Sequence, residues 1–183
     1  MMNRNVLIGV SIHIIILTLS IMLGLYDYIN AYEFVELIFG GDGSIEYDLY
    51  NNLKLVIFIF SRNSATAALM LATGPFLSIL SMVSIAFNGY IIGGVVQYRL
   101  ITYGDPLIRI LGYLLPHGVV ELPTLLMVGG MSFDLGVTLL RNRELLKDKM
   151  GRYLNIYIKF IIPLLLLAAL IEVFITPIIG SMV

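Results

Sequence analysis

The sequence predicts an all-α protein that crosses a membrane several times, a polytopic transmembrane helical bundle. Of its 183 residues, 59% are hydrophobic and 13% are charged, whereas a soluble domain carries about 25% charged residues. The mean hydropathy is +0.96. The apolar residues gather in five main runs, and a helix needs roughly 20 such residues to cross a bilayer. We therefore expect one integral membrane domain over residues 1–183, with about five spans and no separate soluble domain.

The first three spans are predicted at residues 6–25, 53–73 and 75–101. The first run is longer than the 7–15 apolar residues of a signal peptide, and no small-residue cleavage site follows it, so we interpret it as a retained helix. Residues 26–52 contain six acidic residues and no Lys or Arg. The amphipathic start of this segment suits a short interfacial helix. Gly74-Pro75 marks a tight break between the second and third spans.

The fourth apolar run extends from residue 107 to residue 140, which is too long for one unbroken span. Pro116 lacks a backbone N–H and restricts the residue before it. We therefore predict a short helix over residues 106–115, a broken or re-entrant backbone at Pro116–Gly118, and a span over residues 118–140. The fifth span is expected at residues 156–179.

Charge distribution predicts the orientation in the membrane. Residues 141–159 hold six of the 11 Lys and Arg side chains, and five spans place the loop 141–155 on the same side as the N-terminus. Lys and Arg accumulate in cytoplasmic loops. We expect a multi-pass protein of the cell membrane, in contact with lipid, with a cytoplasmic N-terminus, an extracytoplasmic segment 26–52 and an extracytoplasmic C-terminus. A net charge of −1 argues against a nucleic-acid partner.

The run PHGVVELP at residues 116–123 carries the first candidate site. His117 and Glu121 are four residues apart, so in a helix they share one face. Titratable side chains within hydrocarbon are costly and indicate functional sites. One interpretation is a cavity in which the pair binds a ligand or relays protons. The other is a structural pair, in which the imidazole bonds the carboxylate.

A metal ion at His117 and Glu121 is a third interpretation, and we expect no other cofactor. A catalytic Zn2+ usually takes three protein ligands, and the chain has no Cys. The fold would have to supply one more ligand, for which the sequence offers His13, Asp134 and Glu172. On their own, His13 is typical of a packing residue and Glu172 of a hydrogen-bonded or interfacial acid.

Two asparagines and two glycines complete the candidate set. Asn63 and Asn88 lie within expected spans, and each side-chain amide needs hydrogen-bond partners. They either join helices to one another or line a pocket with His117 and Glu121. Gly89-x-x-x-Gly93 has the spacing of close helix–helix contacts. It favours tight packing inside the protein over dimerisation.

The PHGVVELP run resembles the signature of the stage II sporulation protein M family of integral membrane proteins. Asn63, Asn88-Gly89 and Gly93 fit further family positions, as does Gly129-Gly130. Thr124 departs from the Ala that often follows the second proline, Pro123. The resemblance implies a multi-pass membrane protein with site residues Asn63, Asn88, His117 and Glu121. It marks Pro116, Gly118, Pro123, Gly89 and Gly93 as structural.

The resemblance also implies a function. The member that named the family is a membrane scaffold for cell-wall hydrolases that dissolve septal peptidoglycan. Because the family also occurs in organisms that never sporulate, we do not extend sporulation to this chain. We expect a non-enzymatic scaffold that recruits membrane or cell-envelope proteins and forms a homodimer. The main alternative is a transporter or channel-like protein that binds an ion or small solute at His117 and Glu121. A metal-dependent membrane enzyme has less support, since the sequence contains no nucleophile elbow, GxGxxG or P-loop.

Overall fold

The computed structural model describes residues 3–39 and 49–182. Every regular element in these residues is helical, which confirms the predicted all-α fold class. The α-helices are α1 (Arg4–Tyr26), α2 (Tyr28–Phe39), α3 (Leu49–Ala72), α4 (Ile79–Tyr98), α5 (Leu107–Arg141), α6 (Leu146–Ile156), α7 (Ile162–Leu170) and α8 (Thr176–Met182). Wider π-helical turns occupy Arg99–Tyr103, Tyr157–Ile161 and Ile171–Ile175, and a 3-10 turn occupies Arg143–Leu145.

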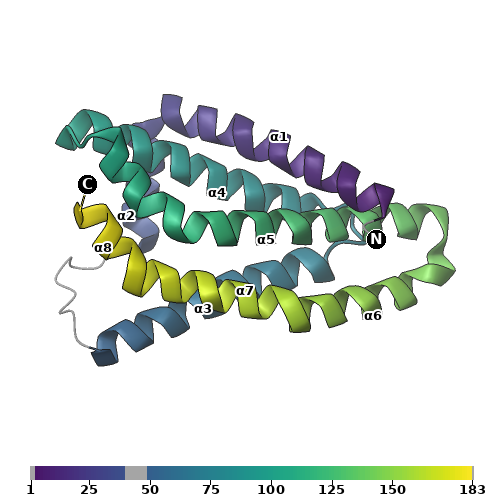
Figure 1. Ribbon diagram of the computed structural model, residues 1–183. Helices are drawn as coiled ribbons and strands as arrows, with labels where there is room; N and C mark the ends of the chain where they lie inside the picture. Colours follow the sequence, from purple (N-terminus) through teal and green to yellow (C-terminus); the bar gives the residue numbers. More distant parts are fainter. Residues whose placement is uncertain (1–2, 40–48, 183) are drawn as a thin grey trace.

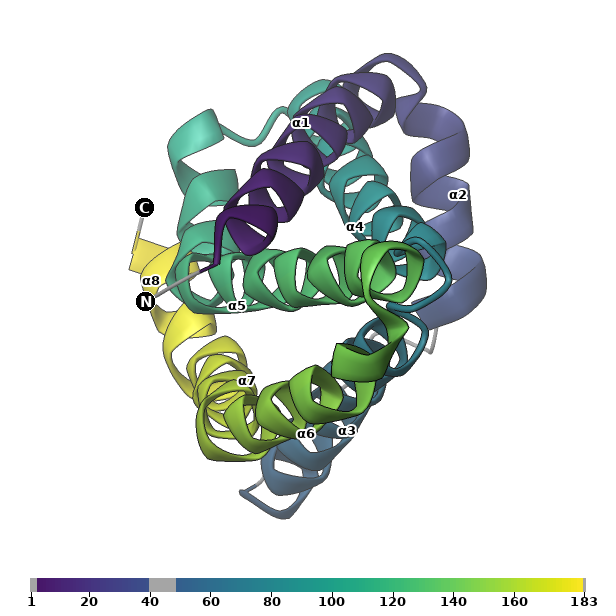
Figure 2. The ribbon, with the colours of Figure 1, turned by 90° about the vertical axis from the view of Figure 1, so that its right-hand side faces the viewer.

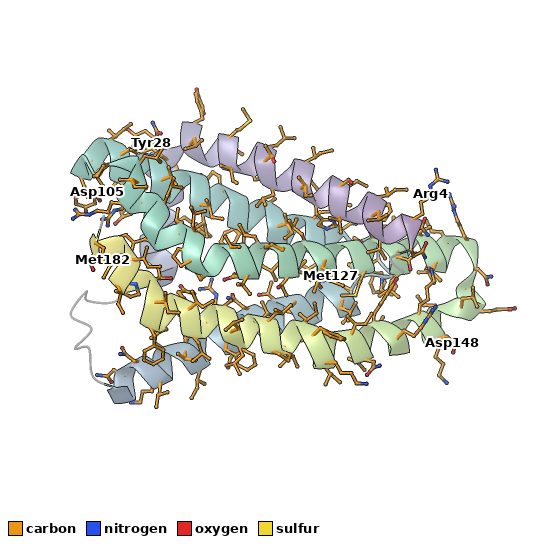
Figure 3. All side chains as sticks on the ribbon, viewed as in Figure 1. Arg4, Tyr28, Asp105, Met127, Asp148 and Met182 are labelled. Carbon is orange, nitrogen blue, oxygen red and sulfur yellow. The ribbon has the colours of Figure 1, made fainter. Side chains whose placement is uncertain are left out.

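Five helical segments of the described residues are long and apolar enough to cross a membrane: Arg4–Tyr26, Asn51–Ala72, Ile79–Tyr103, Leu107–Arg141 and Arg143–Met182. The two chain ends lie at opposite ends of the bundle (Figure 1). Side chains labelled in Figure 3 mark these ends, with Arg4 and Asp148 at one end and Tyr28, Asp105 and Met182 at the other. Part of the acidic segment 26–52, which we expected to be extracytoplasmic, lies outside the described residues, including Asp42, Glu46 and Asp48.

Helix α5 lies in the middle of the bundle. Viewed along the bundle, it runs between the α1–α4 pair and the group formed by α3, α6 and α7 (Figure 2). It contacts α1, α3, α4, α7 and α8. The second half of α5 supplies much of the core, since Val128, Met131 and Leu135 are almost completely buried. The buried second half of α5 can therefore carry polar groups such as Asp134 away from lipid, whereas the first half still exposes Leu115 and Val119.

The backbone around Pro116 differs from the expected break. Residues 116–118 stay helical, and one helix covers Leu107–Arg141, so the separate segment 106–115 does not exist. A proline removes one helical hydrogen bond and crowds the carbonyl four residues earlier, here that of Gly112, and a bend relieves this crowding. The first part of α5 is indeed inclined to the rest (Figure 1). The prolines therefore bend α5 without interrupting it.

Helix α4 also begins later than predicted. The expected span started at residue 75, but the helix starts at Ile79. Leu77 and Ser78 adopt left-handed backbone angles, with φ of 57° and 58°, which side chains with a Cβ rarely adopt. The helix therefore starts four residues later than expected, and residues 76–78 extend the turn beyond Gly74-Pro75.

The α1–α4 contact explains the spaced glycines. A Cβ added at Gly89 would lie 2.7 Å from the carbonyl oxygen of Leu17, and one at Gly93 would collide with the carbonyl oxygen of Ile21. Gly24 on α1 meets the backbone of Tyr90 in the same way. The Gly89-x-x-x-Gly93 spacing thus lets two helices of one chain approach closely, as the small-residue pattern indicates.

Two π-helical turns precede prolines of the last helical segment. Tyr157–Ile161 comes before Pro163, and Ile171–Ile175 comes before Pro177. Widening the helix accommodates the missing N–H and the ring that would press on the carbonyl four residues earlier. The second of these turns contains Glu172, so the local geometry of this acid is set by Pro177.

Candidate functional site

A cavity of about 680 Å³ opens between α3, α4, α5 and the π-helical turn Ile171–Ile175. Pockets of roughly 300–1,000 Å³ are typical of small-molecule sites. Most of the lining is apolar. The polar lining side chains are Arg62, Asn63, Thr66, Ser84, Asn88, His117, Glu121 and Glu172. The structure therefore brings together all four polar residues singled out from the sequence and adds further groups to them.

The cavity lies far from both ends of the helices that form it. Asn63 is nine residues before the end of α3, and Asn88 is nine residues after the start of α4. At 1.5 Å per residue this is about 13 Å, close to half of the ~30 Å hydrocarbon core. Met127, six residues after Glu121 on α5, lies between the two marked ends of the bundle in Figure 3. The polar groups thus lie near the middle of helical segments that are long and apolar enough to cross a membrane.

Three titratable side chains converge on one wall of the cavity. His117 and Glu121 come from consecutive turns of α5, and Glu172 comes from the Ile171–Ile175 turn. One ligand atom from each lies within 4.8 Å of the other two, and all three side chains are half-buried. The sequence offered His13, Asp134 and Glu172 as a third ligand, and the fold places Glu172 beside the pair.

Neighbouring side chains orient this group. The Asn63 amide and the Arg62 guanidinium lie close enough to interact with the Glu121 carboxylate, and Arg62 also lies close enough to interact with Glu172. The Nδ1 atom of His117 lies 3.4 Å from the Thr176 hydroxyl. Among the described lining residues, one guanidinium therefore faces two carboxylates.

Asn88 occupies the facing wall on α4. Its Nδ2 donates to the carbonyl oxygen of Ser84 at 2.8 Å, so one of its two amide hydrogens serves its own helix. The amide has further donor and acceptor capacity. Asn88 and Glu121 therefore line the same pocket from facing walls, and the described hydrogen bond of Asn88 goes to its own helix.

His13 takes no part in the cavity. Its side chain is completely buried. The Nδ1 atom donates to the Gly9 carbonyl at 2.7 Å, and the Nε2 atom lies 2.9 Å from the Ser81 hydroxyl. A Cβ at Gly129 would lie 2.6 Å from the imidazole ring. Both ring nitrogens have partners, so His13 joins α1 to α4 and α5 as a packing residue.

Asp134 forms a second polar cluster, which sequence reasoning named only as a ligand candidate. Its carboxylate is completely buried. It accepts hydrogen bonds from Lys149 Nζ at 2.7 and 2.9 Å, Tyr153 Oη at 2.7 Å, Asn5 Nδ2 at 2.9 Å and Asn3 Nδ2 at 3.1 Å. The cluster ties the start of α1 to α5 and α6. The sequence signal that could have indicated this ion pair is Asp134, a lone acid fifteen residues before Lys149 of the basic run.

The prolines and the glycine of the PHGVVELP run belong to the backbone of α5. Pro116 and Pro123 lie inside α5. A Cβ added at Gly118 would meet nothing within 4 Å, so neither packing nor a left-handed backbone requires a glycine there. The expected role of Gly118 in a backbone break does not apply.

Comparison with known proteins identifies relatives. The sequence profile of the family Stage II sporulation protein M matches residues 6–177. A protein of Methanocaldococcus jannaschii that is described as uncharacterized is 30% identical over 140 residues, which is 71% of this chain and 78% of the archaeal one. No solved structure matches this chain. With its helices, its PHGVVELP run and this near-complete match, the chain belongs to the stage II sporulation protein M family.

Proposed function

We propose that this protein binds a small cationic ligand in the cavity between α3, α4, α5 and the Ile171–Ile175 turn. One observation carries the proposal: Glu121 and Glu172 face each other beside His117 on the wall of a 680 Å³ cavity. Charges removed from water need partners. Arg62 offsets one carboxylate, and a bound cation would offset the other. Such binding suits a transporter or channel-like protein.

Helix geometry at the cavity supports the same proposal. Glu172 lies in a π-helical turn, and α5 contains two prolines on either side of Glu121. π-helical turns are frequent at functional sites. A proline also frees a backbone carbonyl of its own helix, and α5 is bent, although not interrupted, next to Glu121. Both irregular elements meet at this cavity.

The proposal includes an orientation. Arg4 and Asp148, within the basic run 141–159, mark the same end of the bundle (Figure 3). The rule that Lys and Arg accumulate in cytoplasmic loops places this end in the cytoplasm. The N-terminus is then cytoplasmic and the C-terminus extracytoplasmic. A protease-accessibility assay on sealed cells that carry a tag at each terminus tests this orientation.

The binding proposal is tested by thermal unfolding of the purified protein in detergent. The probes are Na+, K+, Mg2+, Mn2+, Zn2+ and the organic cation putrescine, each added to wild type and to Glu121→Gln. A ligand at 100 times its Kd stabilises a protein by about 2.7 kcal/mol. We expect at least one cation to raise the unfolding temperature of wild type and to leave Glu121→Gln unchanged. Equal shifts in both proteins, or no shift with any probe, would contradict the proposal.

A scaffold that recruits envelope proteins is the second candidate, and α2 favours it. This helix lies beside α4, outside the central α5. It exposes Ile29 and Phe34 together with the acidic Glu33. Exposed apolar side chains with a charge among them suit a protein-binding surface.

Crosslinking in cells separates the two candidates. Under the scaffold proposal, Glu33→Lys reduces the crosslinked partner yield, whereas Glu121→Gln leaves it unchanged. Under the ligand-binding proposal, Glu33→Lys leaves the cation-dependent thermal shift intact. A partner yield that Glu33→Lys does not alter would remove the support for a scaffold surface at α2.

A further inference from the structure

The geometry points to a divalent transition-metal site formed by His117, Glu121 and Glu172. This inference rests on the proposed function, because it names the class of cation that the cavity takes. It uses three side chains from two separate helical segments. We infer that the ion is Zn2+ or Mn2+.

Distances support this ligand set. One nitrogen of His117 and one oxygen of each glutamate lie within 4.8 Å of one another. Metal–ligand bonds of about 2.0–2.2 Å place pairs of ligand atoms roughly 3–4 Å apart. Rotation about the side-chain bonds of the two glutamates closes this difference. His117 and Glu121 share one face of α5, so their backbone already presents both side chains to one position.

Outer hydrogen bonds are also in place. Metal-bound histidines usually hydrogen-bond a protein group through the ring nitrogen that does not bind the metal. Here His117 Nδ1 lies 3.4 Å from the Thr176 hydroxyl, which designates Nε2 as the ligand nitrogen. The amide of Asn63 lies beside the Glu121 carboxylate. Two of the three ligands therefore have a polar neighbour.

Ligand chemistry selects the metal. Imidazole suits Zn2+, Fe and Cu, whereas carboxylates also suit Mn2+, and soft ions prefer sulfur. One imidazole and two carboxylates match Zn2+ or Mn2+ better than Mg2+, which binds oxygen ligands and keeps several waters. Three protein ligands leave a coordination position open. The cavity beside the triad supplies room for water or a further ligand at that position.

The arrangement of charge agrees with a metal ion. Two carboxylates within 4.8 Å repel each other strongly where water is scarce. Arg62 interacts with both of them but carries a single positive charge. A divalent ion between the carboxylates replaces repulsion with attraction. The contrast with Asp134 is informative, because there four side chains already donate to one carboxylate.

The test is metal content of the full-length protein in detergent. Each protein is stripped with a chelator, equilibrated with Zn2+ or Mn2+, desalted and analysed by mass spectrometry of the metal. We expect one ion per chain in wild type and in the control Glu144→Gln, which changes an exposed acid. We expect none in His117→Ala and none in Glu172→Gln. X-ray absorption of the Zn2+ form should show one imidazole nitrogen with oxygen ligands, and no sulfur.

Two further measurements separate loss of the ligand from loss of the fold. Without metal, Glu172→Gln should unfold at the same temperature as wild type or higher, since one of the facing charges is gone. Thr176→Val keeps the shape of the side chain, and we expect it to weaken binding about 10-fold, as the loss of an outer hydrogen bond typically does. Both variants should be monodisperse by size-exclusion chromatography.

The result that would overturn the inference is wild-type protein without metal at stoichiometric supply, or full metal content in both His117→Ala and Glu172→Gln. If Na+, K+ or putrescine stabilises wild type and no divalent ion does, the ligand-binding function stands and the metal site fails. If no cation of either class binds, both proposals fail.

Discussion

Two carboxylate clusters lie on the same central helix and differ in how their charges are satisfied. Asp134 accepts hydrogen bonds from four side chains, and Lys149 supplies a full opposite charge at 2.7 Å. Thirteen residues earlier, about 20 Å along α5, Glu121 faces Glu172 across the edge of a cavity. A completed set of protein donors indicates structure, whereas like charges beside open space indicate a binding site.

The largest effect is expected from breaking the Asp134 cluster. Lys149→Met leaves a completely buried carboxylate without its cation, and removal of one partner of a buried ion pair costs about 3–5 kcal/mol. We expect a large loss of unfolding free energy, measured by denaturant titration in detergent micelles. Lys147→Met is the matched control, because Lys147 lies on the same helix and is exposed.

An equal loss in Lys147→Met and Lys149→Met would show that the basic run acts through its general charge. The assignment of the Asp134 cluster to a structural role would then be wrong.

An intermediate effect is expected at the α1–α4 contact, because α1 carries Asn5 of the Asp134 cluster and α4 carries Asn88 of the cavity. In Gly93→Ala the new Cβ would collide with the Ile21 carbonyl oxygen, and forced overpacking costs about 1–3 kcal/mol. Gly118→Ala meets nothing within 4 Å, and alanine is favoured over glycine in a helix by roughly 0.5–1 kcal/mol. We expect Gly93→Ala to lower the unfolding temperature relative to wild type and Gly118→Ala to raise it. A loss of stability in Gly118→Ala comparable with that in Gly93→Ala would count against the described packing.

The smallest effect on stability is expected in the cavity. Glu121→Gln keeps the shape of the side chain and removes one of two facing charges, while an intramembrane hydrogen bond is worth about 0.6 kcal/mol on average. We expect the unfolding free energy of the ligand-free protein to change by less than about 1 kcal/mol. Asp134→Asn provides the contrast, since it removes the charge that Lys149 needs. A larger loss in Glu121→Gln than in Asp134→Asn would reverse our assignment of the two clusters.

Hydropathy predicted the membrane-spanning helical fold because each helix must satisfy its own backbone hydrogen bonds in lipid. Local spacing placed His117 and Glu121 on one face of α5, and the Gly89-x-x-x-Gly93 pattern indicated a close helix contact. These inferences need no knowledge of distant contacts.

Longer-range features did not follow from the sequence. Glu172 is 51 residues from Glu121, so only packing decides that it completes the triad while His13 and Asp134 do not. Lys149 belongs to a run of basic residues, and the sequence indicates for each of them only a role in membrane orientation. The turn after α5 brings Lys149, on α6, next to Asp134. The helix continues through Pro116 because a bend in α5 costs less than leaving backbone groups unpaired in lipid.

The most direct measurement is the Zn2+-induced shift in unfolding temperature, compared between Glu121→Gln and Lys149→Met. Our account predicts that Lys149→Met, although less stable, is still stabilised by Zn2+, because its cavity is intact. It predicts that Glu121→Gln, although nearly as stable as wild type, does not respond. A Zn2+ response retained in Glu121→Gln and lost in Lys149→Met would contradict the division between a binding cluster and a structural one.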